Sequence, residues 1–258
     1  MGLEIGWKIN RTMWNEEKGM YFCLNDKGLQ TPVWHIGGFW PILAGITTDQ
    51  QNKKLIKNLL DQNLFWTDFP FPALAKNHPE FNSLGGYWKG GVWAPTNYMI
   101  LLALNKIGEH KLAFDISQKM FNLVSDVFQN TQTIWEAYAP EFVSGTPHFS
   151  SGIKTDTVRR DFIGWSGLYP TTILMEEVLG IHVSSLYKTV TWKLFLKKNH
   201  GIKNLSIGDG KLDLFREGNS VRIKGINLPG KWKLRIISPE SQEPLEFELQ
   251  NGLKSYNL

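Results

Sequence analysis

Residues 87–98 read Tyr87-Trp88-Lys89-Gly90-Gly91-Val92-Trp93-Ala94-Pro95-Thr96-Asn97-Tyr98 and place two tryptophans in a Gly-rich turn. From Asn97 to Ile107 the sequence takes on a helical pattern. Most aromatic side chains of a globular protein belong to its core, because their burial is strongly favourable. In a turn they more often line a surface or a cleft. This stretch therefore predicts an aromatic loop that leads into a helix and presents a candidate binding surface.

A second aromatic stretch surrounds a single carboxylate. It reads Gln132-Thr133-Ile134-Trp135-Glu136-Ala137-Tyr138-Ala139-Pro140. A pyranose has apolar C–H faces that stack on aromatic rings and a rim of hydroxyls that need hydrogen-bond partners. The two stretches together are therefore typical of a sugar-processing site with Glu136 as its reactive group. The alternative is that Glu136 is an ordinary exposed carboxylate, as most glutamates are.

Residues 1–181 have the pattern of helices joined by long loops. The stripe Leu55, Ile56, Leu59 and Leu60 follows a capping cluster at Thr47-Thr48-Asp49 and has the helical period. Loops longer than ~12–15 residues in a compact domain usually carry function or are disordered. The long loops of this sequence are too rich in aromatic residues for disorder. The helices are expected at residues 3–13, 39–44, 49–60, 97–107, 112–127 and 170–178, and the long loops at residues 19–38, 65–92 and 129–164.

After residue 182 the apolar period changes from helical to alternating. Short alternating runs separated by Gly, Asn and Pro turns predict a small antiparallel β-sandwich. The strands are expected at residues 190–196, 211–215, 220–224, 232–237 and 245–249. The sequence thus predicts a mainly α chain with a β appendage, divided into domains at residues 1–181 and 182–258.

Composition and charge exclude several functional classes. The net charge of the chain is +4. Residues 182–258 contain 13 Lys and Arg and 7 Asp and Glu, whereas residues 1–181 contain 15 Lys and Arg and 17 Asp and Glu. The basic residues alternate with apolar ones, as on the wet face of a sheet, so a nucleic-acid partner is not expected. No apolar run reaches the ~20 residues of a membrane span, and the N-terminal residues lack the layout of a signal peptide. The compartment is left open.

The sequence contains no residue pattern typical of a metal site or a disulfide. Cys23 is the only cysteine, so an internal disulfide is excluded, and six scattered histidines show no zinc spacing. His35 and His148 are expected to be hydrogen-bonding loop residues. Asp161 follows Arg159-Arg160, so a local ion pair is the first expectation for it and substrate contact the second. We expect no cofactor and no metal.

Four ordered segments carry a family resemblance. Residues 87–98 resemble a conserved "YWRGP-W-NY" segment of inverting glycosidases with an (α/α)6 barrel, namely glycoside hydrolase family 63, the mannosylglycerate-hydrolase-like proteins and, more distantly, the trehalases. The other three segments are residues 34–45, residues 135–140 and residues 161–168. The likeness extends over roughly residues 5–181 and implies a partial (α/α)6 toroid. The substrate would be an oligosaccharide or a small glycoside.

The resemblance implies a mechanism and a set of site residues. In these enzymes one carboxylic acid protonates the glycosidic oxygen, while a second carboxylate deprotonates the water that attacks the anomeric carbon. Glu136 matches the position of the general base. Residues that would surround the sugar are Trp34, Trp88, Lys89, Trp93, Tyr138, Phe162 and Trp165, with Asn97 as a polar support.

Two departures from the family pattern stand out. Lys89 replaces the usual Arg, which retains the charge but loses the planar fork suited to paired contacts. The general acid of the family is an Asp in a "W-D-x-S-P-R" type segment, and this chain has none; Trp66-Thr67-Asp68 falls at a different loop of the family. Periodicity gives roughly seven of the twelve helices of a full barrel. We therefore expect the C-terminal half of a catalytic domain, whose partner is the missing N-terminal half.

Three functional hypotheses follow. The first is an exo-acting inverting α-glucosidase or α-mannosidase that uses Glu136 and an acid supplied upstream. The second is a catalytically inactive carbohydrate-binding or assembly module. The third is another (α/α)6 sugar enzyme, such as an epimerase with paired histidines, which is disfavoured because His35 and His148 lack matching helical contexts. The sequence does not distinguish glucose from mannose.

Overall fold

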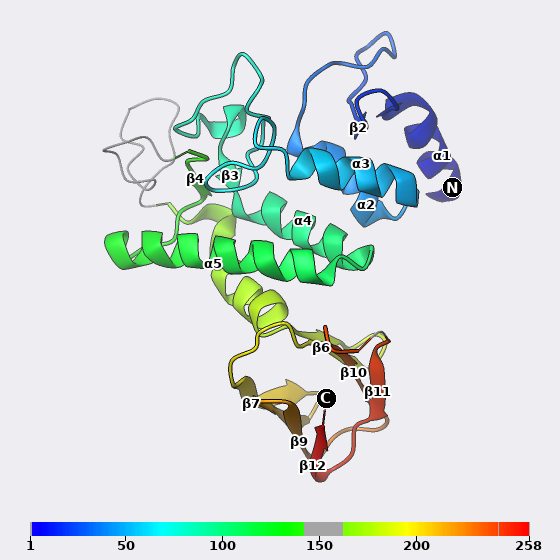
Figure 1. The fold of residues 1–258 in the computed structure, drawn as a ribbon, viewed down its shortest axis with the longest axis vertical. Coiled ribbons are helices and arrows are strands. Elements are labelled where there is room, and N and C mark those ends of the chain that lie inside the picture. Colours follow the sequence, from blue (N-terminus) through cyan, green and yellow to red (C-terminus); the bar gives the residue numbers. More distant parts are fainter. Residues whose placement is uncertain (1, 142–161, 242, 258) are drawn as a thin grey trace. The chain divides into compact units, whose positions relative to one another are not determined.

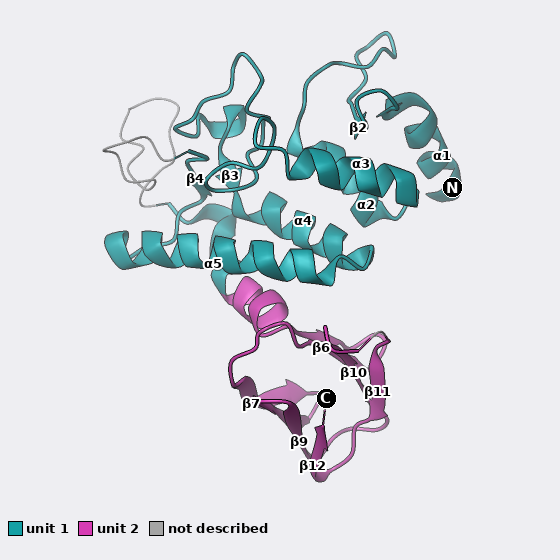
Figure 2. Cartoon of the chain, viewed as in Figure 1, with its two compact units in different colours: residues 1–170 teal, residues 171–258 magenta. Residues whose placement is uncertain are grey.

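The computed structural model describes residues 2–141, 162–241 and 243–257. The chain divides into two compact units, residues 1–170 and residues 171–258 (Figure 2). The sequence-based border at residue 182 marks the start of the strands. The second unit begins earlier because the helix before the strands packs against β5 (Ile181–Ser184).

The predicted helices of the first unit are confirmed with small shifts at their ends. α3 begins after the expected capping cluster: the Thr48 hydroxyl accepts from the Gln51 N–H, and the Gln51 side chain accepts from the Thr48 N–H. Within the described residues of this unit, the α-helices that do not cross its border are α1 (Gly2–Met13), α2 (Trp40–Ala44), α3 (Asp49–Leu59), α4 (Ala94–Lys106) and α5 (His110–Thr131).

Helix α4 is the central element of this unit. It packs along α2 and α5 (Figure 1), and buried side chains lie on more than one of its faces, including Ile100, Leu101 and Ala103. Pro95 stands in the first turn, where its missing N–H is not needed and its fixed φ suits a helix. Because α4 starts directly after Trp93, a rigid core helix anchors the aromatic turn.

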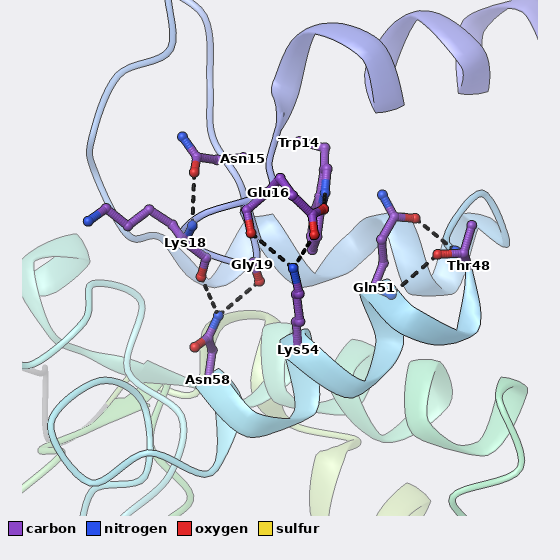
Figure 3. Close-up of polar contacts among 9 residues, drawn as sticks. All are labelled: Trp14, Asn15, Glu16, Lys18, Gly19, Thr48, Gln51, Lys54 and Asn58. Atoms are coloured by element: carbon purple, nitrogen blue, oxygen red, sulfur yellow. Dashed lines mark hydrogen bonds and ion pairs between the residues drawn. The ribbon is translucent and has the colours of Figure 1, made fainter.

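A short hairpin, β1 (Trp14–Asn15) with β2 (Met20–Tyr21), is fixed to α3 by polar contacts (Figure 3). Lys54 donates to the Glu16 carbonyl at 3.0 Å and pairs with its carboxylate. The Asn58 amide donates to the Lys18 and Gly19 carbonyls at 3.0 and 2.9 Å. These bonds satisfy backbone carbonyls that the tight turn leaves unpaired. They hold the hairpin at one fixed place on α3.

The last predicted helix runs across the border between the units. It begins as α6 (Tyr169–Thr172) and continues as a π-helix, η4 (Ile173–Val178), and Gly180 follows with φ +74°. Within the second unit, η4 carries Glu177, whose carboxylate is 3% exposed and lies 2.8 Å from the Lys193 ammonium. This ion pair satisfies two charges that burial would otherwise penalise.

The second unit consists of two four-stranded sheets around one apolar core. The sheets have the strand orders β11-β10-β6-β5 and β12-β9-β8-β7. Both contribute to a cluster that includes Trp192, Leu214 and Leu234, each fully buried. The strands beyond β5 are β6 (Thr189–Lys193), β7 (His200–Ile207), β8 (Gly210–Glu217), β9 (Ser220–Ile226), β10 (Lys233–Ile237), β11 (Leu245–Glu248) and β12 (Gly252–Asn257).

The five predicted strands are confirmed, and the expectation of purely antiparallel pairing is wrong at one place. β6 and β10 run parallel, with Leu234 beside Val190. Alternating sequence patterns show which face a residue takes but not which strand lies beside it. Strands β5, β7 and β12 were not predicted; β7 contains a bulge between Ile202 and Leu205, and most of β12 is exposed.

The expected fold class is correct in part. Six α-helices lie in the described residues, all of them starting in the first unit, while the second unit adds eight strands in two sheets. The chain as a whole is therefore a mixture of helix and sheet, and not clearly mainly α.

Candidate functional site

A two-stranded ladder brings the two aromatic stretches of the sequence together. β3 (Val92–Trp93) pairs antiparallel with β4 (Ala137–Tyr138), and Trp93 lies opposite Ala137. Glu136 precedes β4 directly, so the ladder places it beside the Gly-rich turn. Segments separated by more than 40 positions in the sequence thus lie side by side.

Three indole rings gather around this ladder. Trp88, on the short 3-10 helix η2 (Tyr87–Lys89), stacks on Trp93 with ring centroids 4.5 Å apart and an interplanar angle of 16°. Trp165, on η3 (Gly164–Ser166), meets Trp93 edge-on at 6.0 Å. Tyr87 also contacts Trp93 edge-on, at 5.0 Å. We call Tyr87, Trp88, Trp93 and Trp165 the aromatic cluster.

The Gly-rich turn adopts its shape because side chains are absent at two positions. A Cβ at Gly91 would collide with the Tyr87 carbonyl oxygen, which accepts from the Gly91 N–H at 2.8 Å. Gly86 has φ +48°, a conformation that residues with a Cβ rarely adopt. The turn is closed by a hydrogen bond of 2.8 Å from the Asn82 N–H to the Lys89 carbonyl. Gly residues at these places let the backbone fold tightly under Trp88.

Glu136 is held by its backbone on both sides. Its N–H donates to the Phe162 carbonyl at 3.0 Å, and its carbonyl accepts from the buried Ser166 hydroxyl at 2.7 Å. Its side chain lies against Gly164, where an added Cβ would come within 2.6 Å of Oε1 and 2.9 Å of Cδ. The segment from Phe162 to Ser166 therefore fixes the backbone of Glu136, whose carboxylate packs against Gly164 and remains partly open to solvent.

Burial separates the predicted sugar-contacting residues into two groups. Trp88, Phe162 and Trp165 are 37%, 46% and 56% exposed, so part of each ring reaches the surface. Trp93 and Tyr138 are only 2% and 1% exposed. The indole N–H of Trp93 finds no hydrogen-bond partner among the described residues, which is unusual for a buried donor.

Tyr138 is a core residue in this arrangement. Its ring stacks on Phe69 with centroids 4.7 Å apart, and its hydroxyl accepts from the Trp135 N–H at 3.3 Å. Burial raises the pKa of this hydroxyl. Almost none of the Tyr138 surface is open to a ligand, so its side chain packs in the core next to the site.

The segment that contains Trp34 and His35 reaches the cluster through His35. The imidazole lies 6.1 Å from the Trp88 ring, whereas Trp34 makes an edge-on contact of 5.4 Å with Phe22. Nδ1 of His35 accepts from the Gly37 N–H at 3.1 Å, and desolvation lowers the pKa of the ring. The expected hydrogen-bonding role of His35 is confirmed.

Lys89 makes a surface ion pair. Its ammonium lies 2.9 Å from the Glu80 carboxylate, and both side chains are more than half exposed. This hydrogen bond lowers the pKa of Glu80. Sequence reasoning did not identify Glu80 because Lys89 and Glu80 meet only through the folding of the turn.

Sequence reasoning also missed the roles of Gly164 and Ser166. Both lie in the fourth motif segment, one on each side of Trp165, but neither carries chemistry of its own. The expectations for His148 and Asp161 fall outside the described residues.

Where the structure describes the chain, no group of three His, Cys, Asp or Glu side chains is arranged to hold a metal ion. In the same ranges, every helix is too short or too polar to cross a membrane.

Residues 4–150 match the family model described as the mannosylglycerate hydrolase MGH1-like glycoside hydrolase domain. An uncharacterized protein of Borreliella burgdorferi is 29% identical over 204 residues, which cover 78% of this chain and 43% of that protein. A probable mannosyl-oligosaccharide glucosidase of Schizosaccharomyces pombe is 29% identical over 171 residues, covering 60% of this chain and 20% of that protein. The chain thus spans less than half the length of either relative.

Among solved structures, the neutral trehalase Nth1 of Saccharomyces cerevisiae superposes with a TM-score of 0.50 and 18% sequence identity. The match covers 66% of this chain and 28% of that one. At this identity the similarity concerns the fold alone, and it relates this chain to the (α/α)6 fold of trehalases.

Proposed function

This chain belongs to the family of mannosylglycerate hydrolase MGH1-like glycoside hydrolase domains, and we propose that it carries the general base of an inverting, exo-acting α-glucosidase or α-mannosidase. Glu136 is the proposed base, which deprotonates a water molecule for attack on the anomeric carbon. The observation that carries the proposal is the position of its carboxylate: against Gly164, next to the aromatic cluster and partly open to solvent.

The way in which Glu136 is held supports this role. A general base works best when its position is fixed before the substrate arrives. Two backbone hydrogen bonds, from its N–H to Phe162 and from Ser166 to its carbonyl, leave only the side-chain torsions free. Gly164 removes the one Cβ that would push the carboxylate away.

The exposed aromatic residues are proposed to bind the sugar. Trp88, Phe162 and Trp165 offer ring surface on which the apolar face of a pyranose stacks. The Trp93 N–H has no hydrogen-bond partner in the described residues and is proposed to donate to a sugar hydroxyl. Lys89 and Trp34 are assigned to the rim of the site, because Lys89 pairs with Glu80 and Trp34 packs on Phe22. Tyr138 is proposed to support the site rather than touch the sugar.

The remaining chemistry is proposed to come from a part of the protein outside these 258 residues. An inverting glycosidase needs a second carboxyl group ~6.5–9.5 Å from the base as general acid. The relatives are more than twice as long as the segment they share with this chain. We propose that residues 1–181 are part of an (α/α)6 catalytic domain, that a further segment completes it with the acid, and that residues 182–258 are an appended β-sandwich domain.

The proposed substrate is a glycoside with a terminal α-linked glucose or mannose. The names of the family model and of the fission-yeast relative refer to mannosylglycerate hydrolase and to mannosyl-oligosaccharide glucosidase. A stacking aromatic surface fits either sugar, since the two differ at one hydroxyl.

The test is hydrolysis of a panel of α-glucosides and α-mannosides, with the anomeric configuration of the product followed by NMR. It compares this chain with a version extended by the adjoining coding sequence. Release of the inverted anomer by the extended protein would support the proposal. Retained configuration would contradict the inverting mechanism, and sugar binding without hydrolysis in both proteins would favour the binding or assembly module.

Glu136→Gln in the active form tests the base directly. Loss of a general base should lower kcat about 10²–10⁴-fold while sugar binding is largely retained. Asp126→Asn, an exposed carboxylate on α5, removes the same charge elsewhere and should leave kcat unchanged. Equal kcat values for the Glu136→Gln variant and the parent would rule out Glu136 as the base.

A further inference from the structure

The second unit contains a cavity that is separate from the site around Glu136. Its volume is about 490 Å³, within the range of small-molecule sites. The turn between β5 and β6, the beginning of β10 and strand β11 form its walls. All of these elements belong to residues 171–258.

The cavity opens on the outer face of the sheet. Lys233 lies opposite Glu248 in the β10–β11 ladder, and the next residue, Leu234, is fully buried in the core. Because side chains alternate along a strand, Lys233 and Glu248 both point away from the core. The Lys233 N–H donates to the Lys188 carbonyl at 2.9 Å, which ties the turn to the sheet. The walls are therefore fixed relative to one another.

The lining carries more positive than negative charge. Three ammonium groups, from Lys188, Lys231 and Lys233, meet two carboxylates, from Glu246 and Glu248. Glu246 lies 3.9 Å from Arg235. None of the ion pairs within the described part of the chain includes the three lysines. Their charges are thus available to an anionic group.

An aromatic ring stands at the same cavity. Tyr187 is 76% exposed, an unusual position for so large an apolar surface. Its backbone is held in the turn, since its carbonyl accepts from the Thr189 hydroxyl at 3.0 Å and its N–H donates to the Ser184 hydroxyl at 3.5 Å. An exposed ring on a backbone that is held in a turn is suited to stacking on the face of a ligand.

We propose that this cavity binds a saccharide that carries an anionic group, either a carboxylate or a phosphate. The pyranose ring stacks on Tyr187, the lysines bind the anionic group, and Glu248 accepts a hydrogen bond from a sugar hydroxyl. This assignment does not depend on hydrolysis at Glu136, since every residue involved lies in the second unit.

The test is an NMR titration of the ¹⁵N-labelled chain with four probes: methyl glucuronide, glucose 6-phosphate, methyl glucoside and inorganic phosphate. We expect one or both of the anionic sugars to bind about tenfold more tightly than methyl glucoside, as expected for charge-assisted contacts. Added salt should weaken their binding. The two anionic sugars distinguish a carboxylate from a phosphate ligand.

Variants locate the binding. Lys231→Gln with Lys233→Gln should weaken binding of the anionic sugar about tenfold. Lys211→Gln with Lys224→Gln, which removes the same charge from exposed positions on β8 and β9, should not. Tyr187→Ala should also weaken binding of the anionic sugar. Tyr187→Phe keeps the ring and should bind this sugar as tightly as the parent.

Several results would overturn the proposal. Equal affinity for methyl glucoside and the anionic sugars would remove the role of the lysines. Phosphate binding as tightly as glucose 6-phosphate would reduce the cavity to an anion site without sugar recognition. Failure of all four probes to shift the resonances of the lining residues would exclude the site. The Glu136→Gln variant is the control: it should give the same shifts of the lining-residue resonances as the parent. The test of the cavity is therefore independent of the proposed hydrolase activity.

Discussion

The carboxylate of Glu136 lies against the backbone of Gly164, so closely that a Cβ on Gly164 would come within 2.6 Å of Oε1. Gly164 also has φ +54°. The residue thus meets two separate demands, an αL backbone and an open space above its Cα. The position of the proposed base depends on a residue that has no side chain.

Gly164→Ala should therefore lower activity as well as stability. The positive φ alone should cost more than ~1 kcal/mol of unfolding free energy, and the contact with Glu136 should add to it and displace the carboxylate. Gly28→Ala is the matched control, since Gly28 has φ +74° but nothing within 4 Å of an added Cβ. Denaturant unfolding and hydrolysis rates check both variants. Equal losses of activity in the two would show that the contact has no catalytic importance.

Ser166→Ala should loosen Glu136 from the other side. The buried hydroxyl donates to the Glu136 carbonyl at 2.7 Å, and its loss leaves that carbonyl without this donor, at a cost of about 1 kcal/mol. Ser117→Ala removes an equally buried hydroxyl that bonds to the Phe114 carbonyl within α5. We expect similar changes in unfolding free energy, but a lower kcat only for the Ser166→Ala variant. An unchanged kcat there would mean that this hydrogen bond does not position the base.

Trp88→Ala should weaken sugar binding about tenfold, because the variant loses the exposed stacking face and the support that Trp88 gives Trp93. Trp40 is a close match in exposure, at 38% against 37%, and lies on α2. Trp40→Ala should leave affinity unchanged. Titration with a substrate monosaccharide measures both, and equal affinity in parent and Trp88→Ala protein would contradict the proposed aromatic surface.

His35 predicts a pH dependence of stability. Desolvation lowers the pKa of its ring below the ordinary value of 6.5, so the folded state binds a proton less readily than the unfolded state. Its contribution is complete above that value and is lost as the pH falls toward the folded-state pKa. His35→Asn keeps an acceptor for the Gly37 N–H but cannot titrate, so it should reduce the loss of unfolding free energy between pH 7 and pH 5. An NMR titration of the His35 ring should give the low pKa directly; an ordinary value would contradict this account.

Local signals explain what sequence reasoning predicted well. The α3 capping box involves residues three apart, and the strands β8 and β9 follow alternating patterns that depend only on neighbouring positions. The proximity of the two aromatic stretches was also predicted, from residue types typical of a sugar site rather than from a local pattern. These features need little knowledge of the rest of the chain.

Tertiary structure decided which of these residues reach the surface and what holds them. Trp88 and Trp93 stand in the same motif, yet the first is exposed and the second buried, because Trp88 and Trp165 pack over Trp93. The parallel pairing of β6 with β10 likewise depends on contacts between distant parts of the sequence.

The sequence by itself determined the family, the main helices and strands, and the candidate carboxylate Glu136. Only the tertiary structure showed that Ser166 bonds to the backbone of this residue, that its carboxylate packs against Gly164, and that Tyr138 belongs to the core. The physical reason is that helix caps and strand alternation arise between residues a few positions apart. Burial and the fit of a glutamate over a glycine arise between segments that meet only after the chain has folded.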